Sequence, residues 1–249
     1  MKKLYLAIAM IAIINTLNAQ SGLGTGAGGA SEMSSFKSAN MTLNIDPFGV
    51  VDRDGTMLGI RYAEISGSPF LFEEWRLANI FDINNKKIAQ VKVKYNTNTD
   101  QIHFLDDTEK ELVADKSIIR KVEMLNNQEH NEIAVSFEKG FTDTKNALKS
   151  YQFVQVLNEG SIQILKQYSN QILQKDSLFG TMKINKFSPN ASYYLKTGNN
   201  TISLRKLDLE ELSNLLPNKE LVLNFTKNKK KIKTEKDFVD LLNFYNKGQ

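Results

Sequence analysis

Cysteine is absent from this chain of 249 residues. Without a thiol, the protein forms no disulfide, offers no thiolate to a metal ion and has no cysteine nucleophile. It also lacks the cysteine that carries the lipid of bacterial lipoproteins, so we expect no lipid anchor. The absence of disulfides is compatible even with an exported protein, because a chain of this length can bury a sufficient hydrophobic core.

Histidine is scarce, and the common catalytic motifs are missing. The two histidines, His103 and His130, have no second histidine at the spacing of a zinc site. The chain has no G-x-S-x-G, P-loop or G-x-G-x-x-G in a suitable context. The adjacent Glu73 and Glu74 would point to opposite faces of a strand. We therefore predict no catalytic, cofactor-binding or metal-binding residues, and a protein that is not an enzyme.

The chain has no long apolar run, and its longest continuous apolar stretch, a short one, lies at the N-terminus. Lys2 and Lys3 precede the apolar stretch from Leu4 to Ile14. This stretch has about 11 residues, too few for a bilayer, which needs roughly 20. Small and polar residues follow, up to Ala19. The pattern predicts a signal peptide over residues 1–19, and hence a periplasmic or extracellular protein without a transmembrane segment in its mature form.

The remaining sequence divides into a short segment and one domain. Residues 20–40 are rich in Gly, Ser, Ala and Thr, a composition that does not support a packed core and predicts a flexible segment. Residues 41–246 are expected to form a single β-rich domain, which helices within 207–246 close at its C-terminal end.

The chain has no strong excess of one charge. Without Lys2 and Lys3, the 32 Lys and Arg residues fall to 30, against 28 Asp and Glu. The two signs are interleaved, so we expect no nucleic-acid partner. Lys229, Lys230 and Lys231 form a basic cluster that would suit anionic headgroups or an acidic partner. A solvated connection between two helices is the alternative interpretation.

Alternation of apolar and polar residues predicts antiparallel strands over most of the domain. Val91, Val93 and Tyr95 alternate with lysines, and the turn residues 96–100 then lead to a second alternating run. A second hairpin is expected around Gly198, and residues 161–165 and 168–173 read as two further strands. The expected sheet has one solvated face and forms an open barrel or a sandwich-like arrangement.

The period changes to that of helices after Leu207. Asp208 is a suitable N-cap for a helix that Pro217 ends, and Thr234 with Asp237 predicts a capping box for a second helix. Residues 220–228 form a candidate third helix. The predicted fold class is therefore α+β, with a mainly antiparallel sheet and two or three C-terminal α-helices.

Asp52 and Asp54 lie in a D-x-D-G-T segment that resembles the first motif of haloacid dehalogenase-like phosphatases. In that family such aspartates act as nucleophile and acid/base with Mg²⁺. Ser66 and Asp107 would then supply later motifs. However, that fold needs parallel strands joined by long crossovers, and only nine residues separate Thr56 from Ser66. A hairpin turn at Asp54 is the preferred interpretation, and an Mg²⁺-dependent phosphatase is a weaker alternative.

Aromatic residues gather after Gly67. Phe70, Phe72 and Trp75 form a candidate interaction surface, with packing into the sheet core as the alternative. Several segments of this region and of the C-terminus resemble an uncharacterised family of signal-peptide-bearing proteins from Gram-negative bacteria. The segments are Gly67-Ser68-Pro69-Phe70-Leu71, Glu74-Trp75, Val93-Lys94-Tyr95-Asn96, Asp100-Gln101-Ile102-His103-Phe104 and Phe244-Tyr245-Asn246. The resemblance implies no catalytic activity and no site residues. Asn98 departs from it, since an aromatic residue is usual there.

These observations favour a non-enzymatic cell-envelope protein that acts as a binding module or as an accessory part of a larger assembly. Its partners would be other envelope proteins. The alternative is a carrier of a lipid or another apolar ligand, which requires a cavity of several hundred Å³ lined by Val, Ile, Leu and Phe.

Overall fold

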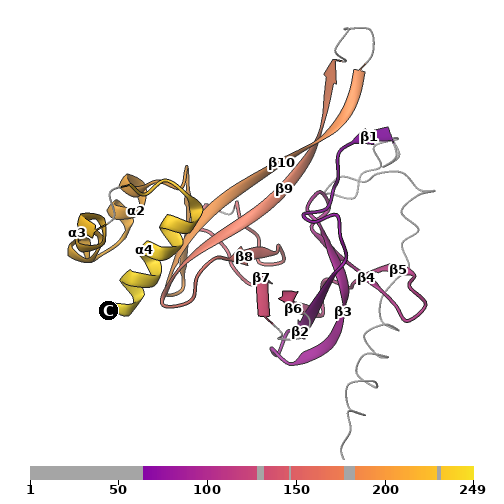
Figure 1. Cartoon of the computed structure of the whole chain (residues 1–249), viewed down its shortest axis with the longest axis horizontal. Coiled ribbons are helices and arrows are strands. Elements are labelled where there is room, and N and C mark those ends of the chain that lie inside the picture. Colours follow the sequence, from indigo (N-terminus) through magenta and orange to yellow (C-terminus); the bar gives the residue numbers. More distant parts are fainter. Residues whose placement is uncertain (1–63, 128–131, 146, 177–182, 229–230) are drawn as a thin grey trace, which may run out of the picture.

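The computed structural model of the chain describes residues 64–127, 132–145, 147–176, 183–228 and 231–249. Within these ranges the chain forms strands followed by helices (Figure 1). The strands are β1 (Ile65–Ser66), β2 (Arg76–Asp82), β3 (Lys87–Asn96), β4 (Gln101–Leu105), β5 (Glu111–Val113), β6 (Ile119–Asn127), β7 (Glu132–Glu138), β8 (Val154–Val156), β9 (Ile162–Asp176), β10 (Lys183–Thr197) and β11 (Asn200–Leu204). The helices are α2 (Leu209–Leu215), α3 (Lys219–Asn228) and α4 (Glu235–Lys247).

All described strands belong to one sheet. Its order is β1-β10-β9-β8-β7-β6-β2-β3-β4-β5, and β11 pairs with β10. The described ladders are antiparallel, apart from the two-residue parallel ladder between β1 and β10. The sheet is not closed, because β1 and β5 lie at its two ends. The α+β class with a mainly antiparallel sheet and C-terminal helices is thus confirmed.

Local sequence signals placed the hairpins and helix caps correctly. The expected hairpin at residues 96–100 joins β3 to β4, and the one at Gly198 joins β10 to β11. The Asp208 carboxylate accepts a hydrogen bond from the Glu211 amide at 2.8 Å at the start of α2. Thr234 and Asp237 form the predicted capping box of α4. These signals act over a few residues, which is why they can be read from sequence.

The prediction of two separate strands at 161–165 and 168–173 was wrong. Both belong to β9, which runs without interruption for 15 residues. Lys166 and Gln167 looked like a polar break. Instead the buried Gln167 accepts a hydrogen bond from the Tyr194 hydroxyl at 2.9 Å, and Lys166 pairs with Glu235 of α4 at 2.6 Å. Long-range partners therefore keep these polar residues within the strand.

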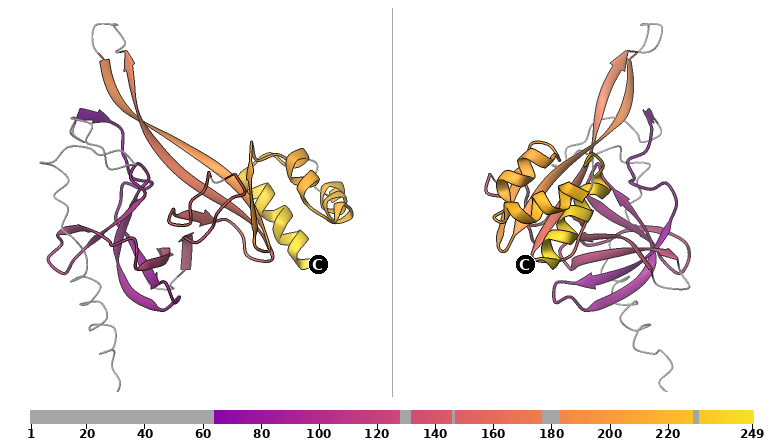
Figure 2. Two further views of the ribbon diagram at one scale, coloured as in Figure 1. Left: turned by 180° about the vertical axis from the view of Figure 1, so that it is seen from behind. Right: turned by 60° about the vertical axis from the view of Figure 1, so that its left-hand side comes forward.

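The two largest hydrophobic clusters of the described residues stabilise the fold. The first is formed mainly by residues of β2, β3, β4, β6 and β7, with Tyr95, Phe104 and Phe137 buried. In the second, α2, α3 and α4 pack on β9, β10 and β11, where Leu241 and Tyr245 are fully buried (Figure 2). The helices therefore cover the inner end of the long β9–β10 hairpin, while its outer end extends beyond the rest of the described chain (Figures 1 and 2).

Candidate functional site: the hairpin arm and its joint

The feature that sets this fold apart is the outer part of the β9–β10 hairpin. We call residues 167–176 and 183–192 the arm, because they lie beyond the ladders with β8 and β11. Strand β1 accompanies the arm on the β10 side, where Ile65 packs against Phe187 (Figure 1). An isolated two-stranded hairpin is only marginally stable in water. The arm therefore depends on contacts at its base.

The base of the arm is held by what we call the joint, formed by Asn170, the turn residues Thr97 and Asn98, and the segment Ser68–Pro69. The Asn170 amide donates to the Thr97 carbonyl at 3.2 Å, and the Asn98 side chain donates to the Asn170 carbonyl at 2.6 Å. The Asn170 side chain in turn donates to the Ser68 carbonyl at 2.8 Å. The Pro69 carbonyl accepts from both the amide and the hydroxyl of Thr97, each at 2.9 Å. The joint therefore fixes the arm to both the β3–β4 turn and the segment before β2.

The β3–β4 turn is buried, which is unusual for a turn and needs internal hydrogen bonds. The Asn96 side-chain oxygen accepts from the amides of Asn98 and Thr99 at 3.0 and 3.2 Å. Asp100 ends the turn in the left-handed conformation, with φ of 58°. Asn and Asp tolerate this conformation better than other non-glycine residues. The Asn and Asp residues of this turn are thus explained by its geometry.

Asp100 also lies at the centre of a buried polar cluster behind the turn. Its Oδ1 accepts from the Tyr95 hydroxyl at 2.7 Å and from the Phe153 amide at 3.3 Å. Its Oδ2 pairs with the Lys116 ammonium, and Lys139 donates to the Lys116 carbonyl. The cluster therefore joins the β3–β4 turn to the segments before β6, after β7 and before β8.

Burial sets the protonation properties of this cluster. Loss of hydration raises the pKa of Asp100, even though Lys116 and the Tyr95 hydroxyl act in the opposite direction. Burial, together with the positive charge of Lys116, lowers the pKa of Lys139 to about 8. Each polar atom named here has a partner within the protein. The arrangement therefore stabilises the turn that carries the joint.

The low pKa of Lys139 predicts a rise in stability with pH. Between pH 8 and 10.5 the folded protein has lost the Lys139 proton, whereas the unfolded chain still binds it. The free energy of unfolding therefore increases across this window, because the unfolded state binds more protons. After allowance for partial solvent exposure we expect a gain of about 1–2 kcal/mol.

Urea unfolding at several pH values measures this gain. The Lys139→Met variant removes the titrating group, so the difference between the two proteins isolates it from other lysines and tyrosines. Parallel pH profiles of the two proteins would contradict the assignment.

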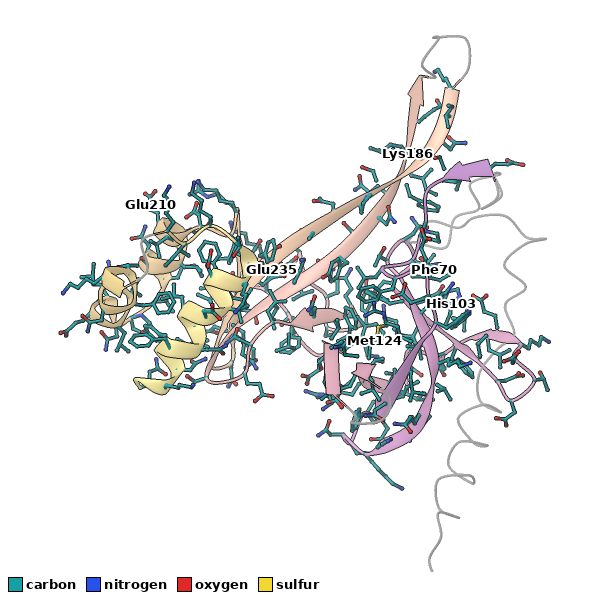
Figure 3. The ribbon with its side chains drawn as sticks, viewed as in Figure 1. Phe70, His103, Met124, Lys186, Glu210 and Glu235 are labelled. Atoms are coloured by element: carbon teal, nitrogen blue, oxygen red, sulfur yellow. The ribbon has the colours of Figure 1, made fainter. Side chains whose placement is uncertain are left out.

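The aromatic residues of the predicted interaction surface make cation–π contacts with neighbouring basic side chains. The Lys94 ammonium lies 5.1 Å from the ring centre of Phe70 and 5.0 Å from that of Trp75. Phe70 also contacts His103 edge-on (Figure 3), and the Arg76 guanidinium lies 3.6 Å from the ring centre of Phe72. All three aromatic residues are half-buried. Much of their surface is therefore used inside the molecule.

The structure places the two candidate surfaces, the aromatic residues and the lysine cluster, apart from each other. Lys231 is exposed between α3 and α4, whereas Phe70 lies on the other side of the arm (Figures 1 and 3). Lys229 and Lys230 lie outside the described residues. The aromatic residues and the lysine cluster are therefore two separate candidate surfaces, and the contact role of each stays a prediction.

The structure also places some of the histidine and acidic residues that the sequence analysis considered as site candidates. His103 is buried, and its Nδ1 lies 2.6 Å from the Glu111 carboxylate. Within the described ranges no group of three or more His, Asp or Glu side chains could hold a metal ion. His130, Asp52 and Asp54 lie outside these ranges. Asp107 is exposed in the β4–β5 turn. The antiparallel ladders also differ from the parallel sheet that the phosphatase hypothesis requires.

A cleft of about 380 Å³ lies between β11 and α2. Eight of its ten lining residues are polar or charged. Its lining residues include Lys145, Arg205, Lys206, Asp208, Glu210 and Glu211. This chemistry does not match the Val, Ile, Leu and Phe lining that an apolar ligand requires.

The motifs behind the family resemblance occupy structural positions around the arm. Ser68 and Pro69 form the joint, Tyr95 and Asp100 form the cluster behind it, and Tyr245 with Asn246 attaches α4. Asn170, the central residue of the joint, was missed by sequence reasoning. It lies within an ordinary alternating strand, and its partners are 72 and 102 positions away.

A scan against protein-family models and searches among curated proteins and solved structures found no match to this chain. No helix of the described ranges is long and apolar enough to cross a membrane.

Proposed function

We propose that the chain is an exported, non-enzymatic protein of the cell envelope and that it acts as a binding or accessory module of a larger assembly. Its place is the periplasm or the cell surface, and its partners are other envelope proteins. The N-terminal pattern of Lys2, Lys3 and the apolar run supports export. We also propose membership of the uncharacterised family that the motifs resemble, on the strength of the sequence motifs themselves.

The observation that carries the binding role is the arm. It extends beyond the rest of the described chain, yet the joint fixes its base with buried hydrogen bonds. Its outer half exposes Leu173 and Ile184, which are 39% and 42% accessible. Large apolar side chains on a projecting hairpin are costly in water and suit contact with another protein. We infer that the arm is the contact surface.

Export is tested with the full chain in a Gram-negative host. We expect recovery outside the cytoplasm, with a mature N-terminus at Gln20 shown by mass spectrometry. The Ile11→Arg variant interrupts the apolar run and should remain unprocessed in the cytoplasm, whereas the control Ile11→Leu should be processed normally. An unprocessed wild-type chain in the cytoplasm would overturn the proposal.

The contact role of the arm is tested by photo-crosslinking in the same cells. A photoreactive residue at position 173 should give covalent adducts of discrete mass. The same residue at Leu223, which is 58% exposed on α3, serves as the control for exposure. Equal adduct patterns at the two positions, or none at position 173, would contradict the role of the arm.

A further inference from the structure

The cluster behind the β3–β4 turn holds a carboxyl group and an amine side by side next to aromatic rings. The side chain of Asp100 is 7% exposed, and that of Lys116, which contacts its Oδ2, is 24% exposed. The Lys116 Nζ lies 5.4 Å from the ring centre of Tyr151 and 5.6 Å from that of Phe153. Two groups held together in this way react with an effective concentration far above that of free reactants. The pair is therefore placed for a chemical step as well as for electrostatic attraction.

The two oxygens of the Asp100 carboxyl group have different partners. Oδ2 faces the Nζ of Lys116. Oδ1 accepts from the Tyr95 hydroxyl at 2.7 Å and from the Phe153 amide at 3.3 Å. When an amine attacks a carboxyl carbon, negative charge moves onto one oxygen, and fixed hydrogen-bond donors at that oxygen stabilise it. Oδ1 is therefore the oxygen suited to carry the charge, and Oδ2 is the one suited to leave.

The charges of the cluster favour the neutral forms that such an attack needs, an uncharged amine and a protonated carboxyl group. Loss of hydration raises the pKa of Asp100, which favours the proton on the carboxyl group. The ammonium of Lys139 lies 5.4 Å from the centre of the same Phe153 ring and repels that of Lys116. Transfer of one proton from Lys116 to Asp100 removes both the buried charge pair and this repulsion.

We propose that Lys116 and Asp100 form an isopeptide bond, a covalent amide between their side chains, and that the ion pair is its precursor. After one proton has passed from Nζ to Oδ2, the neutral amine attacks the carboxyl carbon and a C–N bond forms. The carbonyl electrons move onto Oδ1, to which the Tyr95 hydroxyl and the Phe153 amide donate. A second proton then passes from Nζ to Oδ2, the C–Oδ2 bond breaks and water leaves as the C–Oδ1 double bond re-forms. One amine and one carboxyl group thus give one amide and one water, without a further reactant.

The bond joins the turn between β3 and β4 to the segment between β5 and β6, where Lys116 lies. It closes a loop between residues that are 16 positions apart. A link of this kind restricts the unfolded chain as a disulfide does, and a chain without cysteine has no disulfide of its own. The reaction occurs once in each chain and gives no turnover. It does not depend on the arm as a contact surface.

Tryptic digestion and mass spectrometry of the purified folded chain test the bond. Trypsin cleaves after Lys110, but it does not cleave after a lysine whose amine has become an amide, so Lys116 stays uncut. The digest should therefore contain one branched peptide, residues 95–110 joined to residues 111–120. Its mass should be lower than that of its two parts by about 18 Da, one water. Separate peptides 95–110 and 111–116, with no branched product, would rule out the bond.

Two variants of matched charge identify the nucleophile. Lys116→Arg keeps the positive charge but replaces the amine by a guanidinium group, which stays protonated. It should give no branched peptide, whereas Lys139→Arg should give the same product as the wild type. Circular dichroism of both variants checks that they are folded. A cross-linked peptide from Lys116→Arg, or none from a folded Lys139→Arg, would exclude Lys116 as the nucleophile.

The rate of bond formation tests the donors to Oδ1. The chain is purified in urea and refolded by dilution, and the branched peptide is followed with time. Tyr95→Phe removes one donor and keeps the ring, so its bond should form at least about tenfold more slowly. Equal rates in the two proteins would contradict the role of the Tyr95 hydroxyl. A branched peptide that forms in urea before refolding would exclude the folded cluster as the site of the reaction.

Discussion

Asp100→Ala is expected to lower the free energy of unfolding by about 3 kcal/mol. The substitution removes the acceptor of two buried donors, the Tyr95 hydroxyl and the Phe153 amide. Each buried donor left without a partner costs about 1–3 kcal/mol. Alanine also fits the left-handed conformation at this position poorly, since φ is 58°.

Asp100→Asn is the matched control. Asparagine keeps one acceptor oxygen for the Tyr95 hydroxyl and the Phe153 amide and tolerates the left-handed conformation, whereas its NH2 group replaces the oxygen that accepts from Lys116. Burial raises the pKa of Asp100, so the cost of burying its charge offsets part of the attraction to Lys116. We therefore expect this variant to lose less stability than Asp100→Ala.

Urea unfolding at pH 7 measures both variants. A loss for Asp100→Asn as large as that for Asp100→Ala would show that the ion pair with Lys116 is decisive, and not the acceptor. Tyr95→Phe combined with Asp100→Ala provides a further check. It removes a donor and its acceptor together, so the double variant should lose less than the sum of the two single losses.

Gly160→Ala is expected to cost about 3 kcal/mol, for two reasons that act together. Gly160 has φ of 119°, a conformation that side chains rarely adopt. A Cβ atom there would overlap the Asn246 amide of α4. That amide donates to the carbonyls of Glu159 and Ile162 at 2.9 and 2.8 Å, and accepts from the Ile162 amide at 3.1 Å. The substitution therefore separates α4 from the β8–β9 turn.

Gly198→Ala provides the comparison for backbone strain alone. Gly198 also has a positive φ, 57°, but a Cβ atom added there would meet nothing within 4 Å. We expect this substitution to cost about 1 kcal/mol. Equal losses for the two glycine variants in urea unfolding would contradict the role of Asn246.

Asn246→Ala should relieve the overlap, so a double variant with Gly160→Ala tests the coupling directly. Its loss should be smaller than the sum of the two single losses by about 1 kcal/mol or more. The Asn246→Ala variant alone should cost about 2 kcal/mol, because it leaves the Ile162 amide without its side-chain partner, whereas the Ile162 carbonyl keeps the Asn158 amide group.

The parts of this fold that sequence reasoning predicted are local. The turn at residues 96–100, the hairpin at Gly198 and the capping box of Thr234 and Asp237 depend on neighbouring residues. A few adjacent side chains decide such geometry, so the sequence pattern was sufficient.

The candidate site depends on contacts that sequence patterns do not encode. Asp100, Lys116 and Lys139 come from three separate segments, which only the folded chain brings together. Asn170 meets Ser68 across 102 positions. The continuity of β9 likewise depends on Glu235 and Tyr194, which follow far along the chain. The separation of Phe70 from Lys231 in the fold is likewise set by long-range packing and could not be read from their spacing in the sequence.

The joint has a mechanical consequence. A force on the outer part of the arm would act on Asn170, because the backbone of that residue is hydrogen-bonded to both Thr97 and Asn98. A pull on the far end of the hairpin is therefore transmitted to the β3–β4 turn, and from there through Asp100 to the ammonium group of Lys116. Traction on this protein would therefore alter the environment of the buried Asp100 carboxylate and of Lys116, its half-buried partner.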